Sequence, residues 1–281
     1  MKLQLGTKYV YDGDNYIFEK LGKRKKVTSR LYPSLIGKNK YESIGHALLE
    51  RFSLLEKEEI HPFYSVRGEI AERMMLAYLK EKYRESGIEI VARTWEAEEV
   101  EYDNFQNNPI FGGLIDIAIV APIDCRAVVE VKSKEVKKYK AIKEKGGSTE
   151  EELQGEFLGY MSGVGTCVMA YIFFDKMQEL QITEFIADDV YNGYEVNAKV
   201  AATKILNRYG WTWRNFRYHT YSIPVYGEKT LASMARARAV MEEFEQSRKI
   251  ASSQLKADER IYLNTLYNPS GYTPKIIDRP F

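Results

Sequence analysis

Two apolar runs lie close together near the middle of the chain, and this pair constrains the fold more than any other feature. The first run covers residues 114–120 and the second covers residues 127–131. Pro122, Asp124 and Arg126 supply turn chemistry between them. Short apolar runs bounded by turn residues are typical of buried β-strands. We therefore expect two strands joined by a turn.

Three polar side chains interrupt these runs. Asp116 lies inside the first run, whereas Glu130 and Lys132 lie in the second, two positions apart. Side chains two apart on a strand share one face of the sheet. Burying an unpaired carboxylate costs several kcal/mol, so two carboxylates that converge from neighbouring strands require a compensating cation. A divalent metal ion is the simplest cation of this kind.

Oxygen ligands of this kind suit Mg²⁺, which binds one or two protein carboxylates and keeps its other positions for water and phosphate. Asp116, Glu130 and the main-chain carbonyl of Val131 could supply such ligands. Lys132 could orient an attacking water or stabilise the charge of a transition state. The alternative is a plain hairpin in which Asp116 ends a strand and Glu130 and Lys132 form a solvated ion pair.

The order of these residues resembles the core of the PD-(D/E)XK nucleases, with Gly113 just ahead of the aspartate. Residues 66–72, VRGEIAE, look like the Gly-x-x-x-Glu helix of the lambda-type and RecB-type phage exonucleases. Gln154 begins a segment that leads into an apolar strand at 171–175, as the glutamine motif does in that group. The resemblance covers residues 65–175, and the order of its motifs is more specific than any one of them.

This resemblance implies an α/β fold of the restriction-endonuclease-like class, with a mixed β-sheet flanked by helices and with N- and C-terminal helical additions. It implies a DNA exonuclease of a phage recombination system that uses Mg²⁺, with Mn²⁺ as a substitute. The metal would be bound by Asp116, Glu130, Val131 and, directly or through water, Glu72. Lys132 would serve the attacking water, and Gln154 would help to position it.

Two of these assignments have alternatives. Glu69 and Glu72 lie three apart and share a helix face, and Glu72 is preferred because it fits the Gly-x-x-x-Glu spacing. Both could instead decorate the first turns of a helix, where acidic side chains suit the helix dipole. Gln154 could be an ordinary surface glutamine. The tyrosine that often follows the glutamine in the family is replaced by Phe157, with Tyr160 one turn later.

The charge balance limits how the chain could bind DNA. It has 41 basic and 40 acidic side chains, so no global basic field attracts nucleic acid. Seven lysines lie within residues 132–145, and of these we expect Lys134, Lys137 and Lys138 to contact phosphates without reading sequence. Arg30 lies in a segment that loosely resembles the one near the DNA 5′ end in the phage exonucleases. A lysine run is also often only a solvated segment.

Two cysteines, Cys125 and Cys167, exclude a disulfide framework and indicate a reducing cytoplasm. They cannot supply a four-cysteine iron–sulfur cluster. We find no signal peptide or apolar transmembrane run, so we expect a cytoplasmic protein without membrane contact.

The rest of the chain suggests one domain over 1–281, with a core at 65–187. The N-terminal part, 1–64, holds a hairpin at 9–18 and a helix at 41–57. The C-terminal extension, 188–281, is expected to be helical. The other expected elements are a helix at 66–84, a strand within 88–102, a helix capped by Ser148 and Glu151, a hairpin of strands 168–174 and 180–187, a helix at 188–208 ended by Gly210, and a helix at 229–249. The aromatic and basic cluster at 211–219 could stack unpaired bases, but we expect it to form a packed joint between the sheet and the last helix.

Two other functions remain open. The chain could be an endonuclease of the same fold, or a DNA-binding or assembly protein that keeps the fold without catalysis. The intact Asp116, Glu130 and Lys132 argue against the second. The expected partner is double-stranded DNA with a free end. By resemblance alone, a single-strand annealing protein and a ring-forming homo-oligomer are further expectations.

Overall fold

The computed structural model describes residues 8–20, 60–92, 111–121, 125–193 and 195–255, and residues 257, 260, 261 and 263 near the C-terminus. The chain divides into two compact units. The larger unit is Glu59–Leu231, and the smaller one combines Met1–Glu58 with Ala232–Phe281.

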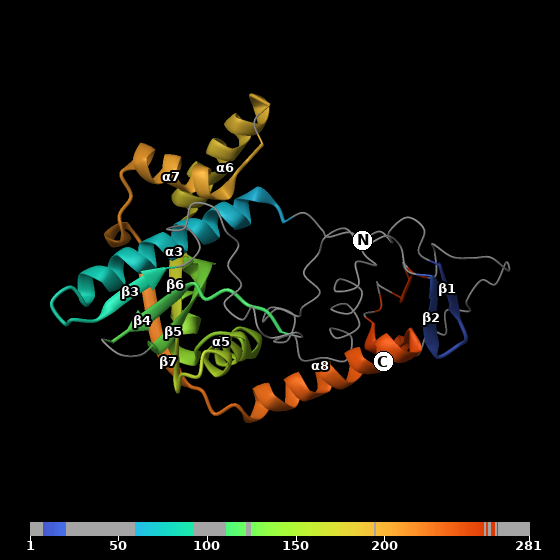
Figure 1. Ribbon diagram of the computed structural model, residues 1–281. Coiled ribbons are helices and arrows are strands. Elements are labelled where there is room, and N and C mark those ends of the chain that lie inside the picture. The colour runs from blue at the N-terminus through green and yellow to red at the C-terminus, as the bar shows by residue number, and fades with distance from the viewer. Residues whose placement is uncertain are drawn as a thin grey trace. The chain divides into compact units, whose positions relative to one another are not determined.

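The larger unit contains a five-stranded sheet in the order β3-β4-β5-β6-β7 (Figure 1). Its strands are β3 Glu89–Ala92, β4 Ile117–Val120, β5 Cys125–Glu135, β6 Thr166–Phe174 and β7 Arg217–Pro224. Strands β5 and β6 are parallel, and all other neighbours are antiparallel. The expected α/β class with a mixed sheet flanked by helices is therefore confirmed.

The parallel pair needs a crossover connection, because a tight turn can join only antiparallel strands. Residues between β5 and β6 form the 3-10 turn η1 Val136–Lys138, the helix α4 Tyr139–Lys145 and the helix α5 Thr149–Met161. Ser148 caps α5, and its side chain and that of Glu151 complete the predicted capping box. This connection brings α5 onto one face of the sheet.

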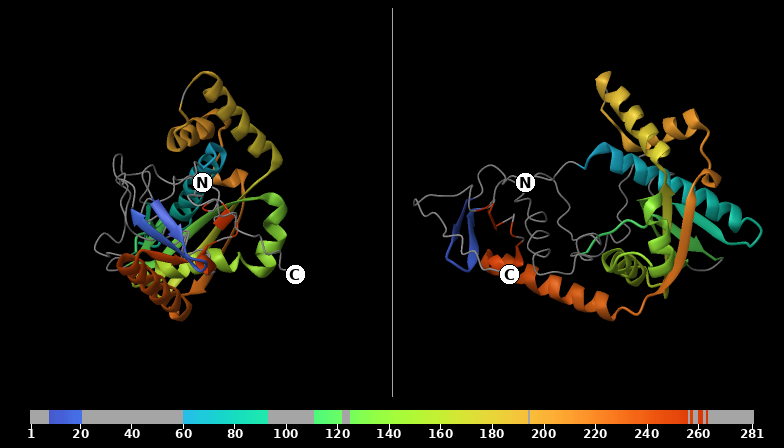
Figure 2. Two further views of the ribbon diagram at one scale, coloured as in Figure 1. Left: turned by 90° about the vertical axis from the view of Figure 1, so that its right-hand side faces the viewer. Right: turned by 180° about the vertical axis from the view of Figure 1, so that it is seen from behind.

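Helix α3, Pro62–Lys82, covers the opposite face (Figures 1 and 2). Helices α6 Lys176–Tyr191 and α7 Ala198–Tyr209 pack against α3 on its far side from the sheet. Alternate strand residues point into this layer and are buried: Ile117, Ile119, Val129, Val131, Ala170 and Ile172. Because strand side chains alternate between faces, the residues between them point towards α5.

Gly155 allows α5 to lie close to the sheet, and this gives a testable result. A Cβ atom at Gly155 would lie 2.7 Å from Met169 Sδ and 2.9 Å from Cys167 Sγ, and both neighbours are fully buried. Gly155→Ala is expected to destabilise the protein by roughly 1–3 kcal/mol through overpacking. Thermal unfolding followed by circular dichroism measures this. Gly165→Ala is the matched control, because a Cβ there meets nothing within 4 Å; equal melting temperatures for the two variants would contradict the prediction.

The smaller unit contains the sheet β1-β2-β8, formed by β1 Lys8–Tyr11, β2 Asn15–Lys20 and β8 Lys249–Ala251. The predicted N-terminal hairpin is confirmed, since β1 and β2 are antiparallel. Asp12 stabilises its turn by accepting hydrogen bonds from the main-chain N–H groups of Asp14 and Asn15. Helix α8, Glu228–Ser247, occupies the region where the last long helix was expected, and the 3-10 turn η3 Ser252–Gln254 follows β8.

Two predictions for residues 175–210 were wrong. The segment expected as a strand at 180–187 lies within helix α6, so the predicted hairpin at residues 177–179 is absent. Asp175 caps this helix and forms a capping box with Gln178, and Ile182, Phe185 and Ile186 bury one helical face. The single helix expected at 188–208 is the end of α6 followed by α7. The predicted end of that helix at Gly210 is confirmed by its left-handed conformation.

The aromatic and basic cluster at 211–219 forms a packed joint, although the structure differs from the expected one. Its end forms strand β7, which was not predicted, and the 3-10 turn η2 Trp213–Asn215 precedes it. Trp213 and Tyr218 both pack against Tyr78 of α3, with ring centroids 5.3 and 4.4 Å away. The joint connects the sheet to α3, whereas the expected partner was the last helix.

Several expectations lie outside the described residues. These are the helix at 41–57, the C-terminal tail, the segment around Arg30 and the part of 88–102 beyond β3. The expected helix at 66–84 begins one turn earlier, at Pro62. Within the described part of the chain, no helix is both long enough and apolar enough to span a bilayer.

Candidate active site

The site lies where β5 extends beyond the end of its partner β4. The last register pair between these strands is Ile117 with Val129. The prediction that Asp116 lies inside the strand was wrong, because β4 begins at Ile117 and Asp116 stands just before it. Asp116 Oδ2 accepts a hydrogen bond of 2.7 Å from the Val131 N–H. The N–H and C=O groups of one strand residue point to the same side, so the Val131 carbonyl also points towards the side of Asp116.

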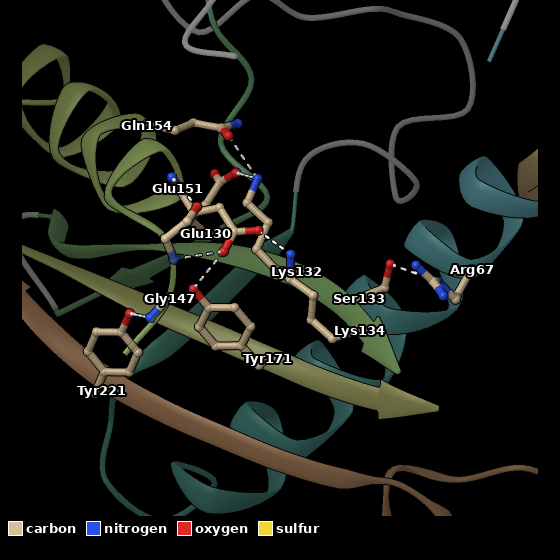
Figure 3. Close-up of polar contacts among 11 residues, drawn as sticks. Arg67, Glu130, Lys132, Ser133, Lys134, Gly147, Glu151, Gln154, Tyr171 and Tyr221 are labelled. Carbon is tan, nitrogen blue, oxygen red and sulfur yellow. Dashed lines mark hydrogen bonds and ion pairs between the residues drawn. The ribbon is translucent and has the colours of Figure 1, made fainter. Parts of the chain in front are cut away.

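Lys132 links the second carboxylate to helix α5. Its Nζ donates to Glu130 Oε1 at 2.6 Å and to Gln154 Oε1 at 2.8 Å (Figure 3). Glu130 is only 3% exposed, so the alternative of a solvated ion pair is wrong. Gln154 contacts Lys132 and is half-buried, which also excludes an ordinary surface glutamine.

The electrostatic state of the two carboxyl groups differs from that of exposed acids. Burial raises the pKa of Asp116 well above its usual value, and the charges of Glu130 and Glu72 raise it further. Burial also raises the pKa of Glu130, against the opposing effect of Lys132. Burial lowers the pKa of Lys132, but Glu130 and Asp116 outweigh it and raise that pKa overall. The site thus holds acidic charge that one lysine only partly offsets.

Helix α3 places Glu72 and Glu69 differently. Because α3 begins at Pro62, with His61 as its N-cap, its first turn has no acidic residue. The idea that both glutamates decorate the first turns is therefore wrong. Glu72 acts electrostatically on Asp116, whereas Glu69 lies 3.9 Å from Arg73, away from that interaction. Of the two, Glu72 is the one whose charge reaches the site.

The predicted DNA-binding lysines fall into two groups. Lys134 forms an ion pair with Glu151 of α5 and is half-buried (Figure 3). Lys137 and Lys138 are exposed, and Lys137 is paired with Glu135 beside it on the surface. Arg30 is outside the described residues. The structure thus directs Lys134 into the site and leaves the other two at the surface.

Four side chains beside the site were missed in the sequence: Glu151, Glu152, Tyr171 and Tyr221. Tyr171 donates to Glu151 Oε2 at 3.3 Å, and Tyr221 donates to Glu152 Oε1 at 2.9 Å. Glu151 was predicted only as a capping residue. The register of β5 and β6 places Tyr171 opposite Lys132, but that register has no signal in the sequence.

The oxygen atoms of the site limit which metal ion could bind there. Among the described residues, no group of three or more histidine, cysteine or acidic side chains is arranged to hold one. Asp116 and Glu130 provide two carboxylates, and their hydrogen bonds to Val131 N–H and Lys132 occupy one oxygen of each. Two carboxylates and a main-chain carbonyl are few ligands, and they are all oxygens. This set fits Mg²⁺, which keeps several of its waters, better than metals that prefer nitrogen or sulfur.

Comparisons with known proteins give a limited likeness. No protein-family model matches the chain, and no curated protein matches it. Among solved structures, the chain is similar to an alkaline exonuclease, LHK-Exo, from Laribacter hongkongensis, at a TM-score of 0.44 and 12% identity over 78% of this chain and 93% of that one. The chain is also similar to a structure of LHK-Exo in complex with dAMP, at a TM-score of 0.43 and 11% identity over 78% of this chain and 93% of that one. At this level of similarity, function has to be argued from the residues of the site.

Proposed function

We propose that this chain is a divalent-metal-dependent DNA exonuclease of the PD-(D/E)XK kind, which hydrolyses phosphodiester bonds from a DNA end. The observation that carries the proposal is the arrangement of Asp116, Glu130 and Lys132 where β5 extends beyond β4. Two carboxylates with raised pKa values lie beside a half-buried ammonium group that also contacts an amide oxygen. This is the set of groups that metal-assisted phosphodiester hydrolysis needs.

The metal would be held by Asp116, Glu130 and the carbonyl of Val131, with Glu72 assisting directly or through water. Mg²⁺ is the expected ion and Mn²⁺ the expected substitute. When bound, it would polarise the phosphate and lower the pKa of a coordinated water. Its charge would also offset the repulsion of Asp116 by Glu130 and Glu72, which adds to burial in raising the pKa of Asp116.

Lys132 and Gln154 would act on the reacting water and the phosphate. The Lys132 ammonium carries a fixed charge in a partly dry site, where it stabilises negative charge more than it would in water. Gln154 Oε1 accepts from that ammonium, which leaves the amide NH₂ of Gln154 as a donor for a phosphate oxygen or a water. The two side chains therefore present donors to the same small region.

DNA binding in this proposal relies on local basic groups and not on overall charge. Lys137 and Lys138 are exposed on η1, at the end of β5 that carries Lys132 and Lys134. Lysine contacts to phosphates are independent of sequence, so the substrate would be duplex DNA of any sequence. Arg30 and Lys134 would add further contacts. A role in phage recombination, with a single-strand annealing protein as partner and a homo-oligomeric ring, completes the proposal.

Glu72 and Glu69 provide a matched pair of variants on one helix. Glu72→Gln is expected to raise the Mg²⁺ concentration needed for half-maximal DNA hydrolysis by about 10-fold or more, as for other groups that support a metal site. Its charge acts on Asp116, whereas that of Glu69 is paired with Arg73. Glu69→Gln is therefore the control and should leave the Mg²⁺ requirement unchanged. Equal shifts in both variants would contradict the assignment of Glu72.

The proposal is tested by comparing two DNA substrates of the same sequence, one linear and one a covalently closed circle. An exonuclease degrades the linear duplex with Mg²⁺ and leaves the circle intact, because it needs an end. Cleavage of the circle would instead identify an endonuclease. Binding of both substrates without cleavage in Mg²⁺ or Mn²⁺ would identify a DNA-binding protein on a nuclease fold.

A further inference from the structure

The start of helix α5 is tied to three neighbouring strands of the sheet by polar side chains. From β5, Lys134 pairs with Glu151, and from β6, Tyr171 donates to the other oxygen of Glu151 at 3.3 Å. From β7, Tyr221 donates to Glu152 at 2.9 Å. The same hydroxyl accepts a hydrogen bond of 2.6 Å from the Gly147 N–H (Figure 3). These contacts lie within the first turn of α5 and the two residues before it.

The rings of the two tyrosines, Tyr171 and Tyr221, are stacked. They are nearly parallel, with an interplanar angle of 7° and centroids 6.1 Å apart. The Tyr171 ring is fully buried, and burial raises the pKa of its hydroxyl, which is further raised by Tyr221 and Glu151. The Tyr171 hydroxyl therefore keeps its proton and stays a donor. Lys134 outweighs burial and lowers the pKa of Glu151, which stays an ionised acceptor.

The turn before α5 is fitted closely against this pair. A Cβ atom at Gly147 would lie 1.9 Å from Tyr171 Oη and 3.0 Å from Tyr171 Cζ. Only glycine fits there while the Tyr171 hydroxyl stays in place. The turn is thus linked to the Tyr221 hydroxyl by a hydrogen bond and to the Tyr171 hydroxyl by shape.

Gln154 lies on the same helix, three residues after Glu151, and therefore on the same side of α5. Its Oε1 atom is 2.8 Å from Lys132 Nζ. A shift of the first turn of α5 would move Gln154 with it, because the backbone of a helix moves as one body over a single turn. The distance between Gln154 and Lys132 consequently depends on what holds that turn.

We propose that Tyr171 and Tyr221 are positioning residues that hold the first turn of α5 so that Gln154 stays against Lys132. This inference rests on the proposed nuclease function, in which Lys132 and Gln154 act on the water and the phosphate. The tyrosines act through Gln154, and their hydroxyls contact Glu151, Glu152 and Gly147 rather than Lys132.

The test is a double-mutant cycle on single-turnover hydrolysis of end-labelled linear duplex. Tyr221→Phe and Tyr171→Phe are each expected to lower the rate constant by about 10-fold, since small misplacements of catalytic groups have large effects on rate. When Gln154 is already replaced by Ala, each tyrosine substitution should lower the rate constant by less than about 2-fold more, because the effects of substitutions at coupled residues are not additive. Affinity for DNA should not change. Tyr191→Phe is the control, as Tyr191 is 91% exposed.

A second readout does not depend on activity. The side-chain amide signal of Gln154 in a ¹H–¹⁵N NMR spectrum can be assigned by its loss in Gln154→Ala. It is expected to shift in Tyr171→Phe and Tyr221→Phe and to stay in place in Tyr191→Phe. If wild type does not degrade DNA, the proposed function fails, and this shift still decides whether the tyrosines position Gln154.

Gly147→Ala is a third variant, and a second substitution should restore part of its activity. A general loss of stability would not be reversed in this way. The added methyl group displaces the Tyr171 hydroxyl, so activity should fall, and Tyr171→Phe in the same chain removes the clashing oxygen. The double variant is expected to be more active than Gly147→Ala alone. Three results would each overturn the inference. The tyrosine variants could lower the rate constant by the same factor with and without Gln154, the Gln154 amide signal could stay in place in both tyrosine variants, or Tyr171→Phe could fail to restore activity to Gly147→Ala.

Discussion

Lys132→Ala is expected to abolish most of the DNA hydrolysis, lowering the rate constant by roughly 10²–10⁴-fold. The ammonium group lies 2.6 Å from Glu130 Oε1 and 2.8 Å from Gln154 Oε1. Its removal takes away the charge that would stabilise the transition state, and it separates Gln154 from β5. Single-turnover degradation of end-labelled linear duplex with saturating Mg²⁺ measures the loss.

DNA binding separates this effect from a loss of affinity. The dissociation constant of Lys132→Ala for the same duplex should stay within a few-fold of wild type, because one partly buried lysine is a small part of a phosphate-binding surface. Lys140→Ala is the control for the loss of one lysine charge, since Lys140 is exposed on α4. If Lys132→Ala hydrolyses DNA at the wild-type rate, the assignment of the active site is wrong.

Asp116→Asn is expected to remove activity and to stabilise the metal-free protein at the same time. The pKa of Asp116 is raised well above its usual value, first by burial and then by Glu130 and Glu72. A carboxyl group with a raised pKa in the folded state stabilises the fold at low pH, and this contribution is lost as pH rises through the folded pKa. Asparagine stays neutral and can still accept the hydrogen bond from Val131 N–H.

Thermal unfolding in EDTA and in Mg²⁺ measures both effects. Near pH 8 in EDTA, Asp116→Asn should melt higher than wild type, by about 2–4 °C for each kcal/mol gained. Mg²⁺ should raise the melting temperature of wild type more near pH 8 than near pH 5, because it binds the deprotonated acids. It should not stabilise Asp116→Asn.

Asp188→Asn provides the control for this experiment. Asp188 is exposed on α6, so its replacement should leave both the melting temperature and the response to Mg²⁺ as in wild type. A lower melting temperature of Asp116→Asn in EDTA, or a wild type that does not respond to Mg²⁺, would contradict the account of the site.

Several parts of the site could be predicted from the sequence because they break strong patterns. Asp116, Glu130 and Lys132 stand out since they interrupt apolar runs of the sequence, and strand alternation places Glu130 and Lys132 on one face. Ser148 and Glu151 mark the start of α5 by a capping box that forms as expected. These signals are local, involve few residues and do not depend on distant parts of the chain.

The missed elements have physical reasons. Residues 180–187 contain Ile182, Thr183 and Phe185, which favour strands, and tertiary packing in a helix overrides that preference. The capping pair Asp175 and Gln178 was the signal that could have identified α6. Strand β7 was interpreted only as an aromatic joint, and Tyr221 was missed with it. The contact of Tyr171 with Glu151 depends on the register of a parallel strand pair, which no local pattern specifies.

The central claim is that this chain hydrolyses DNA with a divalent metal, and one time course tests it most directly. Linear duplex DNA labelled at one end is incubated with the wild-type protein in Mg²⁺, in EDTA, and in EDTA followed by excess Mg²⁺. Acid-soluble nucleotides are expected to be released in Mg²⁺ and not in EDTA, and their release should resume when Mg²⁺ is added back. DNA that stays intact in Mg²⁺ and in Mn²⁺ while the protein binds it would contradict the claim.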